Sequence, residues 1–435
     1  MKQIILPTQN NKESMWLLMQ ELFPKFRCLC GPSFRESLEV IRAQVPLSHL
    51  NYKCGENING WILPYEYSVN EAWVRDLKSG KIVIDVKNHH YHLALYSSCF
   101  SGVVKKEELL KHIFVSESLE DAIPLRHFYN KQEWGFCITK DQKAMLKSPQ
   151  YEVNVNTNHE EGFLTLGEYY LPGASEKEIV ITSYLCHPHG ANDNLSGVVV
   201  AVELFKLLSK LKNRKYSYRL LLNPETFGTL AWLHSSKTKL EKIVGGFEIS
   251  ICGDNHPLRY CKSTSKEVEI DRASSLVIGN QTRIIEPKFS QSGCDFSQFN
   301  APQIRLPFGR WTRANMEGYK EYHTSKDNLD IVSSSNLHDT LKNIWKSILI
   351  LEMNEVYHPN YKGLPSMHSL GIYPYHLYPI GGASLNEQVS AYYELLGMVD
   401  GESDLIEISK KTNIDILHFI NPVNDFIEKG LIHTT

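Results

Sequence analysis

Three segments of the chain carry side chains that could bind a metal ion and activate water. They are SYLCHPHGANDNLSG at residues 183–197, NPETFG at residues 223–228 and EYHTSKDN at residues 321–328. The first offers His187 and Asp193, the second Glu225, and the third His323. Imidazole and carboxylate groups are zinc ligands, and a carboxylate near the metal can act as a general base. These residue types predict a zinc-dependent hydrolase.

The first two segments each follow a predicted strand of an α/β sheet. Strand-like runs occupy residues 178–185, 216–223 and 244–252, and helix-like runs occupy residues 195–211 and 229–236. Strands separated by helices imply right-handed crossovers and a mostly parallel sheet. Sites in such sheets form beyond the carboxyl ends of the strands. We therefore expect His187 and Glu225 at the same edge of the sheet.

Each segment also has an interpretation that needs no metal. Asp193 or Ser196 could cap the helix that follows, beside solvated histidines. Glu225 could be a favourable charge near the N-terminus of the next helix. His323 taken alone could be a surface histidine. The three segments in this order are more specific than any one of them.

The order and spacing of these segments resemble a clan of zinc aminopeptidases. The clan includes bacterial leucyl aminopeptidases and glutaminyl cyclase, and the agreement covers about residues 150–355. Its pattern is a strand-end His, a D-N-x-S-G loop, E-E after the next strand, an Asp strand, and H-T-x-x-D. The chain is more closely similar to bacterial aminopeptidase-like proteins with a β-rich insertion and a C-terminal winged helix.

The resemblance implies a role for each matching residue. His187 matches a ligand of a first metal, and Asp193 matches a carboxylate that bridges two metals. His323 matches a ligand of the second metal. Glu225 matches the first Glu of E-E, which is the general base. Asp327, or a backbone carbonyl, could hold the other ring nitrogen of His323.

Two positions depart from the clan's pattern. Thr226 stands where a carboxylate ligand of the second metal is expected, and Ser250 stands where the FEISIC strand should offer an Asp. Two dications about 3.5–4 Å apart repel strongly, and the usual cluster offsets this with three carboxylates. We therefore expect one zinc, held by His187, Asp193 and His323, with Glu225 close enough to serve as a fourth ligand. Asp254 and His189 are the residues that could replace the missing ligands.

Other polar side chains near these motifs are weaker candidates for the site. Asp295, in GCDFSQF at residues 293–299, could shape a substrate pocket. Cys186 is not expected to pair with His187, because neighbours on a strand point to opposite faces. Three arginines could bind a substrate carboxylate or phosphate bidentately, or lie in solvated surface pairs. They are Arg305, Arg310 and Arg313.

The types of residue along the chain predict that it is divided into three parts. Residues 1–60 and 146–365 form the α/β catalytic domain, a three-layer αβα fold. Residues 61–145 are rich in β-branched and aromatic residues and form an inserted β-rich module. Residues 366–435 contain three helix-like runs and form a winged helix-turn-helix domain. Its last helix has a single lysine, Lys429, beside two Asp and one Glu, so we expect no DNA binding.

Composition narrows the function classes further. The 435 residues contain 46 Lys and Arg against 49 Asp and Glu. This near-balance lacks the excess of basic residues that is typical of proteins that bind nucleic acid or an acidic membrane surface. No apolar run approaches the roughly 18 residues of a membrane span, and the N-terminus does not resemble a signal peptide. Nine scattered cysteines are typical of reduced thiols in a cytoplasmic protein. The sequence leaves a homo-oligomer open.

We expect hydrolysis of an amide bond in a small substrate, at the N-terminal residue of a peptide. Zinc would polarise the carbonyl, and Glu225 would take a proton from water and pass it to the leaving amine. The alternative enzyme is an amidase or deacylase acting on a sugar or cell-envelope precursor. An inactive metal-binding scaffold and a DNA-binding regulator are alternatives from other classes. The presence of Glu225 argues against a scaffold, which has no use for a base.

Overall fold

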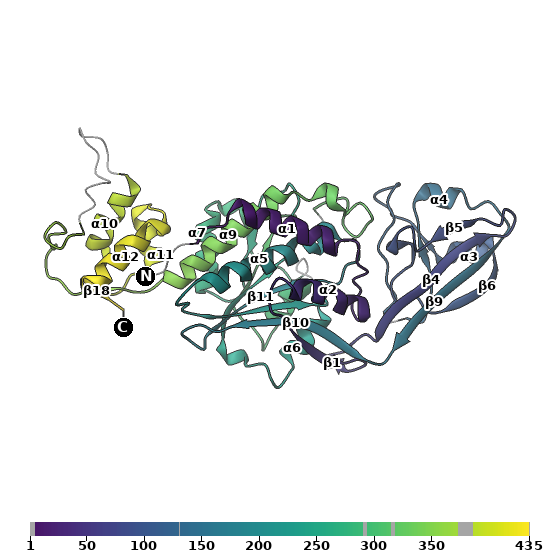
Figure 1. Ribbon diagram of the computed structural model, residues 1–435, viewed down its shortest axis with the longest axis horizontal. Helices are drawn as coiled ribbons and strands as arrows, with labels where there is room; N and C mark the ends of the chain where they lie inside the picture. Colours follow the sequence, from purple (N-terminus) through teal and green to yellow (C-terminus); the bar gives the residue numbers. More distant parts are fainter. Residues whose placement is uncertain (1–4, 130, 290–293, 315–317, 373–385, 435) are drawn as a thin grey trace.

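The molecule consists of three parts arranged along its long axis (Figure 1). The computed structural model describes residues 5–129, 131–289, 294–314, 318–372 and 386–434. An α/β domain occupies the middle, a β-rich module lies at one end, and the C-terminal helices lie at the other (Figure 1). None of the described helices combines the length and apolar character that a membrane-spanning helix requires.

The α/β domain is built on an eight-stranded sheet. In spatial order its strands are β1 (Ser48–Lys53), β10 (Phe163–Leu171), β12 (Ser217–Asn223), β11 (Glu178–Tyr184), β13 (Ile243–Ile249), β16 (Phe308–Thr312), β14 (Arg259–Cys261) and β15 (Ile284–Ile285). The four central strands, β12 to β16, run parallel, while β1, β10 and β14 are joined antiparallel. The expected mostly parallel sheet is confirmed. β11 is buried along its whole length, as a central strand covered on both faces must be.

Helices cover both faces of this sheet, which confirms the three-layer arrangement. One layer contains α1 (Gln9–Leu22), α2 (Pro32–Arg42), α5 (Ser196–Lys210), α7 (Glu269–Ile278) and α9 (Ser334–Met353). The other contains α6 (Phe227–Leu233) and α8 (Cys294–Phe299). Helix α5 is apolar on nearly all sides and buried from Ser196 to Phe205, because it lies between the sheet and the outer helices.

The β-rich module contains a four-stranded antiparallel sheet. Its strands, in spatial order, are β5 (Ile82–Asp85), β4 (Glu66–Asp76), β9 (Gln150–Glu160) and β6 (Phe100–Lys105). Shorter elements complete it: β2 (Asn57–Ile58), β3 (Trp61–Ile62), α3 (Lys106–Leu109), β7 (Ile113–Phe114), β8 (Phe136–Cys137) and α4 (Lys140–Ala144). Strand β9 pairs with β4 along its length. The module's sheet therefore extends to Glu160, beyond the boundary near residue 145 that the sequence suggested.

The C-terminal unit contains the three expected helices, α10 (Glu387–Met398), α11 (Leu405–Thr412) and α12 (Ile420–Glu428). The last expected helix is divided, because a short 3-10 turn over Ile416–Phe419 precedes α12. The final strand, β18 (Ile432–His433), pairs antiparallel with β17 (His358–Pro359), which follows α9. A winged helix stays a prediction for this unit.

Candidate metal centre

The metal-site residues gather at the carboxyl edge of the central strands. Strand β11 ends at Tyr184 and its parallel neighbour β12 ends at Asn223, so the loops after them start side by side. His187 and Glu225 lie in these loops, and His187 Nε2 is 3.5 Å from Glu225 Oε2. The proximity expected from two parallel strands is present in the structure.

Asp193 lies between the two predicted histidine ligands. Its Oδ2 atom is 3.7 Å from His187 Nε2 and 3.2 Å from His323 Nε2. The Asp193 side chain is 2% exposed. Ligand atoms about 2.0–2.2 Å from one tetrahedral zinc lie roughly 3.4 Å from each other. The spacing of these three side chains therefore fits one ion.

The same side chains contain polar atoms that the protein leaves unsatisfied. Asp193 Oδ2 and His323 Nε2 are both buried and have no hydrogen-bond partner among the described residues. Their 3.2 Å approach lacks the geometry of a hydrogen bond. Leaving a buried acceptor and ring nitrogen unpaired costs about 1–3 kcal/mol each. A cation shared by both atoms removes this cost, so the donor set fits a metal such as zinc.

A hydrogen-bond network holds Asp193 and its loop in place. Tyr184 Oη donates to Asp193 Oδ1 at 2.6 Å, which leaves Oδ2 facing the histidines. The Asp327 carboxylate accepts from the backbone N–H of Asn192 at 2.7 Å and of Asp193 at 2.9 Å. Tyr319 Oη also donates to Asp327, at 3.0 Å. Asp327 thus orients the Asp193 loop and not the ring of His323, which was one of the two alternatives that the sequence left open.

The electrostatics favour the protonation states that a metal requires. Burial lowers the pKa of His187 to about 4, which outweighs the opposing charge of Asp193. Burial alone would raise the pKa of Asp193, but His187, His323 and the Tyr184 hydroxyl outweigh burial and lower the pKa to about 2. Neutral imidazole and ionised carboxylate are the metal-binding forms. At pH 7 His187 is therefore neutral and Asp193 ionised, so neither has to lose a proton when a metal binds.

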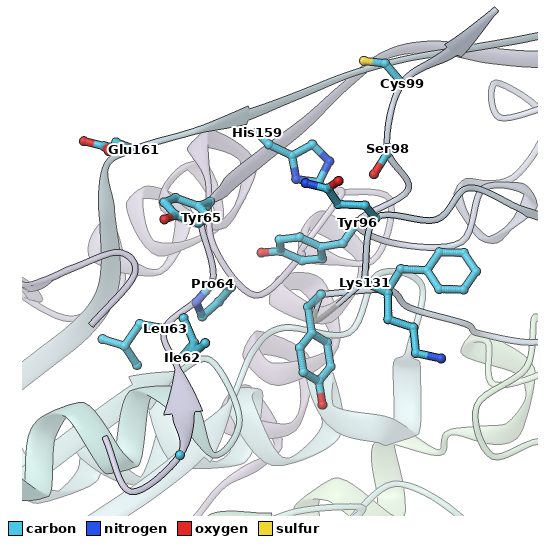
Figure 2. A pocket seen from close by; sticks show the side chains of 14 residues that line it. Ile62, Leu63, Pro64, Tyr65, Tyr96, Ser98, Cys99, Lys131, His159 and Glu161 are labelled. Atoms are coloured by element: carbon cyan, nitrogen blue, oxygen red, sulfur yellow. The ribbon is translucent and has the colours of Figure 1, made fainter. Parts of the chain in front are cut away.

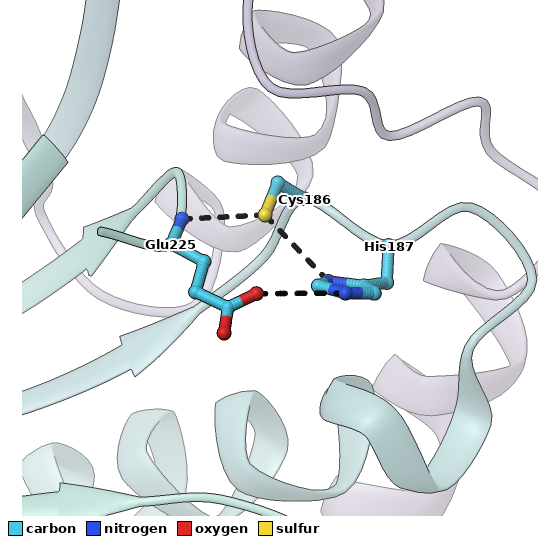
Figure 3. A group of neighbouring side chains, drawn as sticks. All are labelled: Cys186, His187 and Glu225. Carbon is cyan, nitrogen blue, oxygen red and sulfur yellow. Dashed lines mark hydrogen bonds and ion pairs between the residues drawn. The ribbon is translucent and has the colours of Figure 1, made fainter. Parts of the chain in front are cut away.

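Cys186 contacts both His187 and Glu225, so the expectation that it points away from His187 is wrong. Its Sγ atom is 3.6 Å from His187 Nδ1 and accepts the backbone N–H of Glu225 at 3.2 Å (Figure 3). The alternation of side chains applies only within a strand, and β11 ends at Tyr184. Burial raises the pKa of Cys186 well above its usual range, so the thiol stays neutral. It fixes the Glu225 turn, and with His187 and Glu225 it forms a second group of potential metal donors.

Asp295 holds the turn that carries Glu225. Its Oδ1 atom accepts from the backbone N–H of Thr226 at 2.8 Å and from Thr229 Oγ1 at 2.7 Å. Its Oδ2 atom accepts from Asn223 Nδ2 at 3.0 Å. Thr226 has a left-handed backbone with φ of 63°, a conformation that a β-branched residue adopts only when its surroundings impose it. The buried Asp295 carboxylate provides that restraint.

The proposed substitutes for missing ligands lie outside both donor groups among the described residues. Asp254 Oδ2 accepts from Asn192 Nδ2 at 2.8 Å, and Asp254 Oδ1 accepts from the backbone and ring N–H of His256. The His189 ring stacks on His89, with centroids 4.5 Å apart. Ser250 Oγ donates to Glu248 at 2.8 Å. These side chains support the surrounding structure.

The three arginines do not form the expected cluster. Arg313 is buried and donates to the carbonyls of Cys252, His256 and Asn336. These bonds tie the end of β16 to the segment after β13 and to α9. Arg310 is buried within β16, whereas Arg305 is exposed. As a group, the three arginines therefore fit neither interpretation from the sequence, bidentate substrate binding or solvated surface pairs.

The β-rich module contributes to the site, which sequence reasoning missed. Residues Pro124 and Thr324 form an antiparallel bridge beside His323. The backbone N–H of Leu125 donates to the His323 carbonyl at 2.7 Å, and the N–H of Ile123 donates to Ser325 Oγ at 3.0 Å. No motif in this part of the sequence indicated the contact.

The αβα fold is the fold found in zinc aminopeptidases of known structure. A zinc aminopeptidase from Bacillus subtilis superposes with a TM-score of 0.56 at 12% identity, covering 80% of this chain and 96% of that one. An M28 peptidase precursor from Shewanella amazonensis gives a TM-score of 0.54 at 11% identity, covering 79% and 97%. At these identities the likeness shows the fold.

The chain belongs to the family described as "Domain of unknown function (DUF4910)", whose model matches residues 16–354. A relative from Clostridium acetobutylicum is 35% identical over 423 residues, 95% of each chain. Its name describes a candidate polysaccharide biosynthesis protein with an aminopeptidase-like domain. A crystal structure of a candidate peptidase from the same species gives a TM-score of 0.85 at 32% identity, covering 98% of both chains. The resemblance inferred from the sequence is confirmed.

Proposed function

We propose that this protein is a zinc-dependent hydrolase of the aminopeptidase type that cleaves an amide bond. The observation that carries the proposal is the pair of buried, unpartnered atoms Asp193 Oδ2 and His323 Nε2 beside His187 and Glu225. His187, Asp193 and His323 would hold the ion. When bound by three protein ligands, zinc polarises a carbonyl and lowers the pKa of water toward about 7.

The role of the protein side chains follows from their placement. Glu225 Oε2 lies 3.5 Å from His187 Nε2, and its side chain is 22% exposed, so it reaches both the donor group and solvent. Its carboxylate accepts the proton of the attacking water and returns it to the leaving amine nitrogen. Cys186 and Asp295 hold the backbone of this turn, so they position Glu225.

The decisive experiment compares Glu225→Gln with Asp193→Ala in the full chain. Glu225→Gln keeps the shape of the side chain but removes the base, so the rate should fall by about 10²–10⁴ while zinc content stays unchanged. Asp193→Ala should lose the zinc itself. Turnover would be measured on aminoacyl arylamides and N-acyl compounds. Zinc loss in Glu225→Gln would make Glu225 a ligand, and unchanged activity would remove it from the mechanism.

We also propose a single zinc per chain. Thr226 and Ser250 offer only neutral hydroxyls at the positions of missing carboxylates, and both oxygens of Asp254 are engaged elsewhere. Without a third carboxylate, the repulsion between two dications is under-compensated. Elemental analysis of protein purified without added metal should give close to one zinc. Two ions per chain would contradict the proposal and direct attention to Cys186.

A second candidate function is an amidase or deacylase acting on a sugar or cell-envelope precursor. The name of the Clostridium relative favours it, because that name joins polysaccharide biosynthesis to an aminopeptidase-like domain. The two functions share the metal centre and differ in the group that carries the amide. Including N-acetylated sugars in the same substrate screen distinguishes them, since an aminopeptidase requires a free α-amine.

The C-terminal unit is proposed to pack against the α/β domain and not to bind DNA. Arg272 of α7 forms a bidentate ion pair with Asp404, at 2.6 and 2.8 Å. Lys346 of α9 pairs with Asp415, at the start of the segment expected to form the unit's last helix. The unit's last helix also lacks the basic side chains that phosphate contacts need. Salt-dependent duplex binding by the full chain, tight at physiological ionic strength, would overturn this proposal.

A further inference from the structure

A cavity of about 910 Å³ lies at the junction of the β-rich module and the α/β domain. Its walls come from the β2–β3 hairpin, from the segments around Tyr96 and Tyr129 of the module, and from the β9–β10 corner. Figure 2 shows Tyr65, Tyr96 and His159 around the same space. This volume is within the roughly 300–1,000 Å³ range of small-molecule sites.

One wall of the cavity packs against the helix that follows the Glu225 turn. Tyr129 lines the cavity, and its ring packs edge-on against Phe227 at 5.3 Å. Phe227 follows Glu225 by two positions and begins α6. Tyr129 is also close enough to Glu225 that the carboxylate, after burial, contributes to raising the pKa of the phenol. A molecule in the cavity would therefore extend past Tyr129 toward Glu225.

The lining combines aromatic faces with neutral hydrogen-bonding groups. Tyr65, Tyr96 and Tyr129 present rings, and Ser98 and Gln132 present an uncharged hydroxyl and amide. Within the described part of the chain, the Ser98 hydroxyl, the Gln132 amide and the Tyr129 hydroxyl have no hydrogen-bond partner. They are available to a ligand.

The charged groups of the lining do not select a charged ligand. Lys131 and Glu161 are both exposed and have opposite signs, so they produce no net charge. A phosphate or carboxylate ligand needs a desolvated, charge-assisted partner to bind firmly. A wholly apolar side chain would make no hydrogen bond to the Ser98 hydroxyl or the Gln132 amide. A ring with apolar faces and hydroxyl-bearing edges can pack on the tyrosine rings and also form hydrogen bonds with the hydroxyl and amide groups of the lining.

We infer that this cavity is the subsite that holds a neutral saccharide ring of the substrate. The inference rests on the proposed amide hydrolase function, since it places the ring next to an amide at Glu225. Tyr65 stacks on one face of the ring, and Ser98 and Gln132 bind its hydroxyl groups. The module, which is an insertion in the α/β domain, thereby selects the substrate.

Equilibrium binding to the zinc-loaded Glu225→Gln chain tests this inference without turnover. The probes are N-acetylglucosamine and its β-1,4-linked trimer, with N-acetyl-phenylalanine amide as the peptide-like alternative, all followed by calorimetry. Tyr65 is 45% exposed, so Tyr65→Ala removes a stacking face without emptying a core. It should weaken trimer binding about tenfold, the loss expected for one aromatic contact. Gln132→Ala should also weaken it.

The matched control is Tyr393→Ala, which removes a tyrosine of similar exposure, 36%, from the C-terminal unit. It should leave trimer binding unchanged. The inference is overturned if no saccharide binds, if Tyr65→Ala binds the trimer as well as its parent does, or if the peptide-like probe binds more tightly in a Tyr65-dependent manner. Because binding is measured without catalysis, saccharide binding together with no hydrolytic activity in the unsubstituted chain would reject only the hydrolase. Arylamide hydrolysis without saccharide binding would reject only the subsite.

Discussion

The β-rich module and the C-terminal unit both flank the α/β domain, but they contact different parts of it. The module reaches the metal centre, where Leu125 hydrogen-bonds the His323 carbonyl. The C-terminal unit lies at the opposite end of the molecule (Figure 1), and ion pairs hold it on α7 and α9. The family match, residues 16–354, includes the whole module and ends before the C-terminal helices.

This difference shows that a unit added to the α/β domain can contact the site, as the β-rich module does, or only the surrounding helices, as the C-terminal unit does. A backbone bridge such as that between Pro124 and Thr324 fixes the position of a loop directly. Ion pairs between helices such as Arg272–Asp404 fix the orientation of a unit and leave the site loops untouched. Zinc affinity is a measurement that separates the two kinds of attachment.

The largest change in zinc affinity short of deleting a ligand is expected for Asp327→Asn. The Asn side chain has one acceptor oxygen and one NH₂ group, whereas both oxygens of Asp327 accept the backbone N–H groups of Asn192 and Asp193. One of these N–H groups would therefore face another donor. Loss of such outer support typically costs about 10–100-fold in metal affinity. Competition with a chromophoric zinc chelator would measure it. Asp254→Asn is the control, since it alters a buried acid of the same region that lies outside the donor groups; equal losses in both variants would contradict the assignment.

A smaller loss is expected when the module's link to the site is weakened. Ser325→Ala removes the acceptor of the Ile123 N–H and loosens the loop that carries His323. One hydrogen bond contributes about 0.5–1.5 kcal/mol, so zinc affinity should fall by up to about tenfold. Ser148→Ala breaks a hydrogen bond to Asp76 inside the module and should leave zinc affinity unchanged. If both variants lose zinc affinity equally, the module acts only through its overall stability.

No change in zinc affinity is expected for Arg272→Met. This variant removes the bidentate partner of Asp404 but preserves the Asp404 cap on α11. The amides of α11 should exchange faster with solvent, which hydrogen exchange followed by mass spectrometry would detect. Arg75→Met, which breaks a half-buried ion pair with Glu152 in the module, should change neither zinc affinity nor the exchange of the α11 amides. A drop in zinc affinity in Arg272→Met would show that the C-terminal unit is coupled to the site.

The smallest effect concerns pH. Burial alone would raise the pKa of Asp404, but hydrogen bonds from Arg272 and Asn354 outweigh burial and lower it. A carboxyl with a lowered folded-state pKa stabilises fully above its unfolded pKa of about 3.9 and loses this contribution as pH falls through the folded value. Protection of α11 should therefore stay constant from pH 8 to 5 and fall below about pH 4. A loss of protection that begins near pH 6 would implicate a histidine instead.

The amino-acid sequence determined the features that depend on local pattern and strand order. The run Glu178–Tyr184, the helix Ser196–Lys210 and the next strand had to form a parallel βαβ unit, and this placed His187 beside Glu225. The residue types at positions 226 and 250 also determined that two carboxylates of the related cluster are absent. These conclusions need only the period of a strand, the hand of a crossover and the chemistry of side chains.

Only the tertiary structure decided which groups support and surround that site. Cys186 contacts His187 because the strand ends before it, and Asp327 binds the Asp193 loop across a separation of 134 positions. The cavity at Tyr129 exists because a module inserted near the N-terminus folds back onto α6. Such contacts join residues that no short-range pattern relates. Their geometry follows from how whole elements pack, and a sequence motif carries no information about that packing.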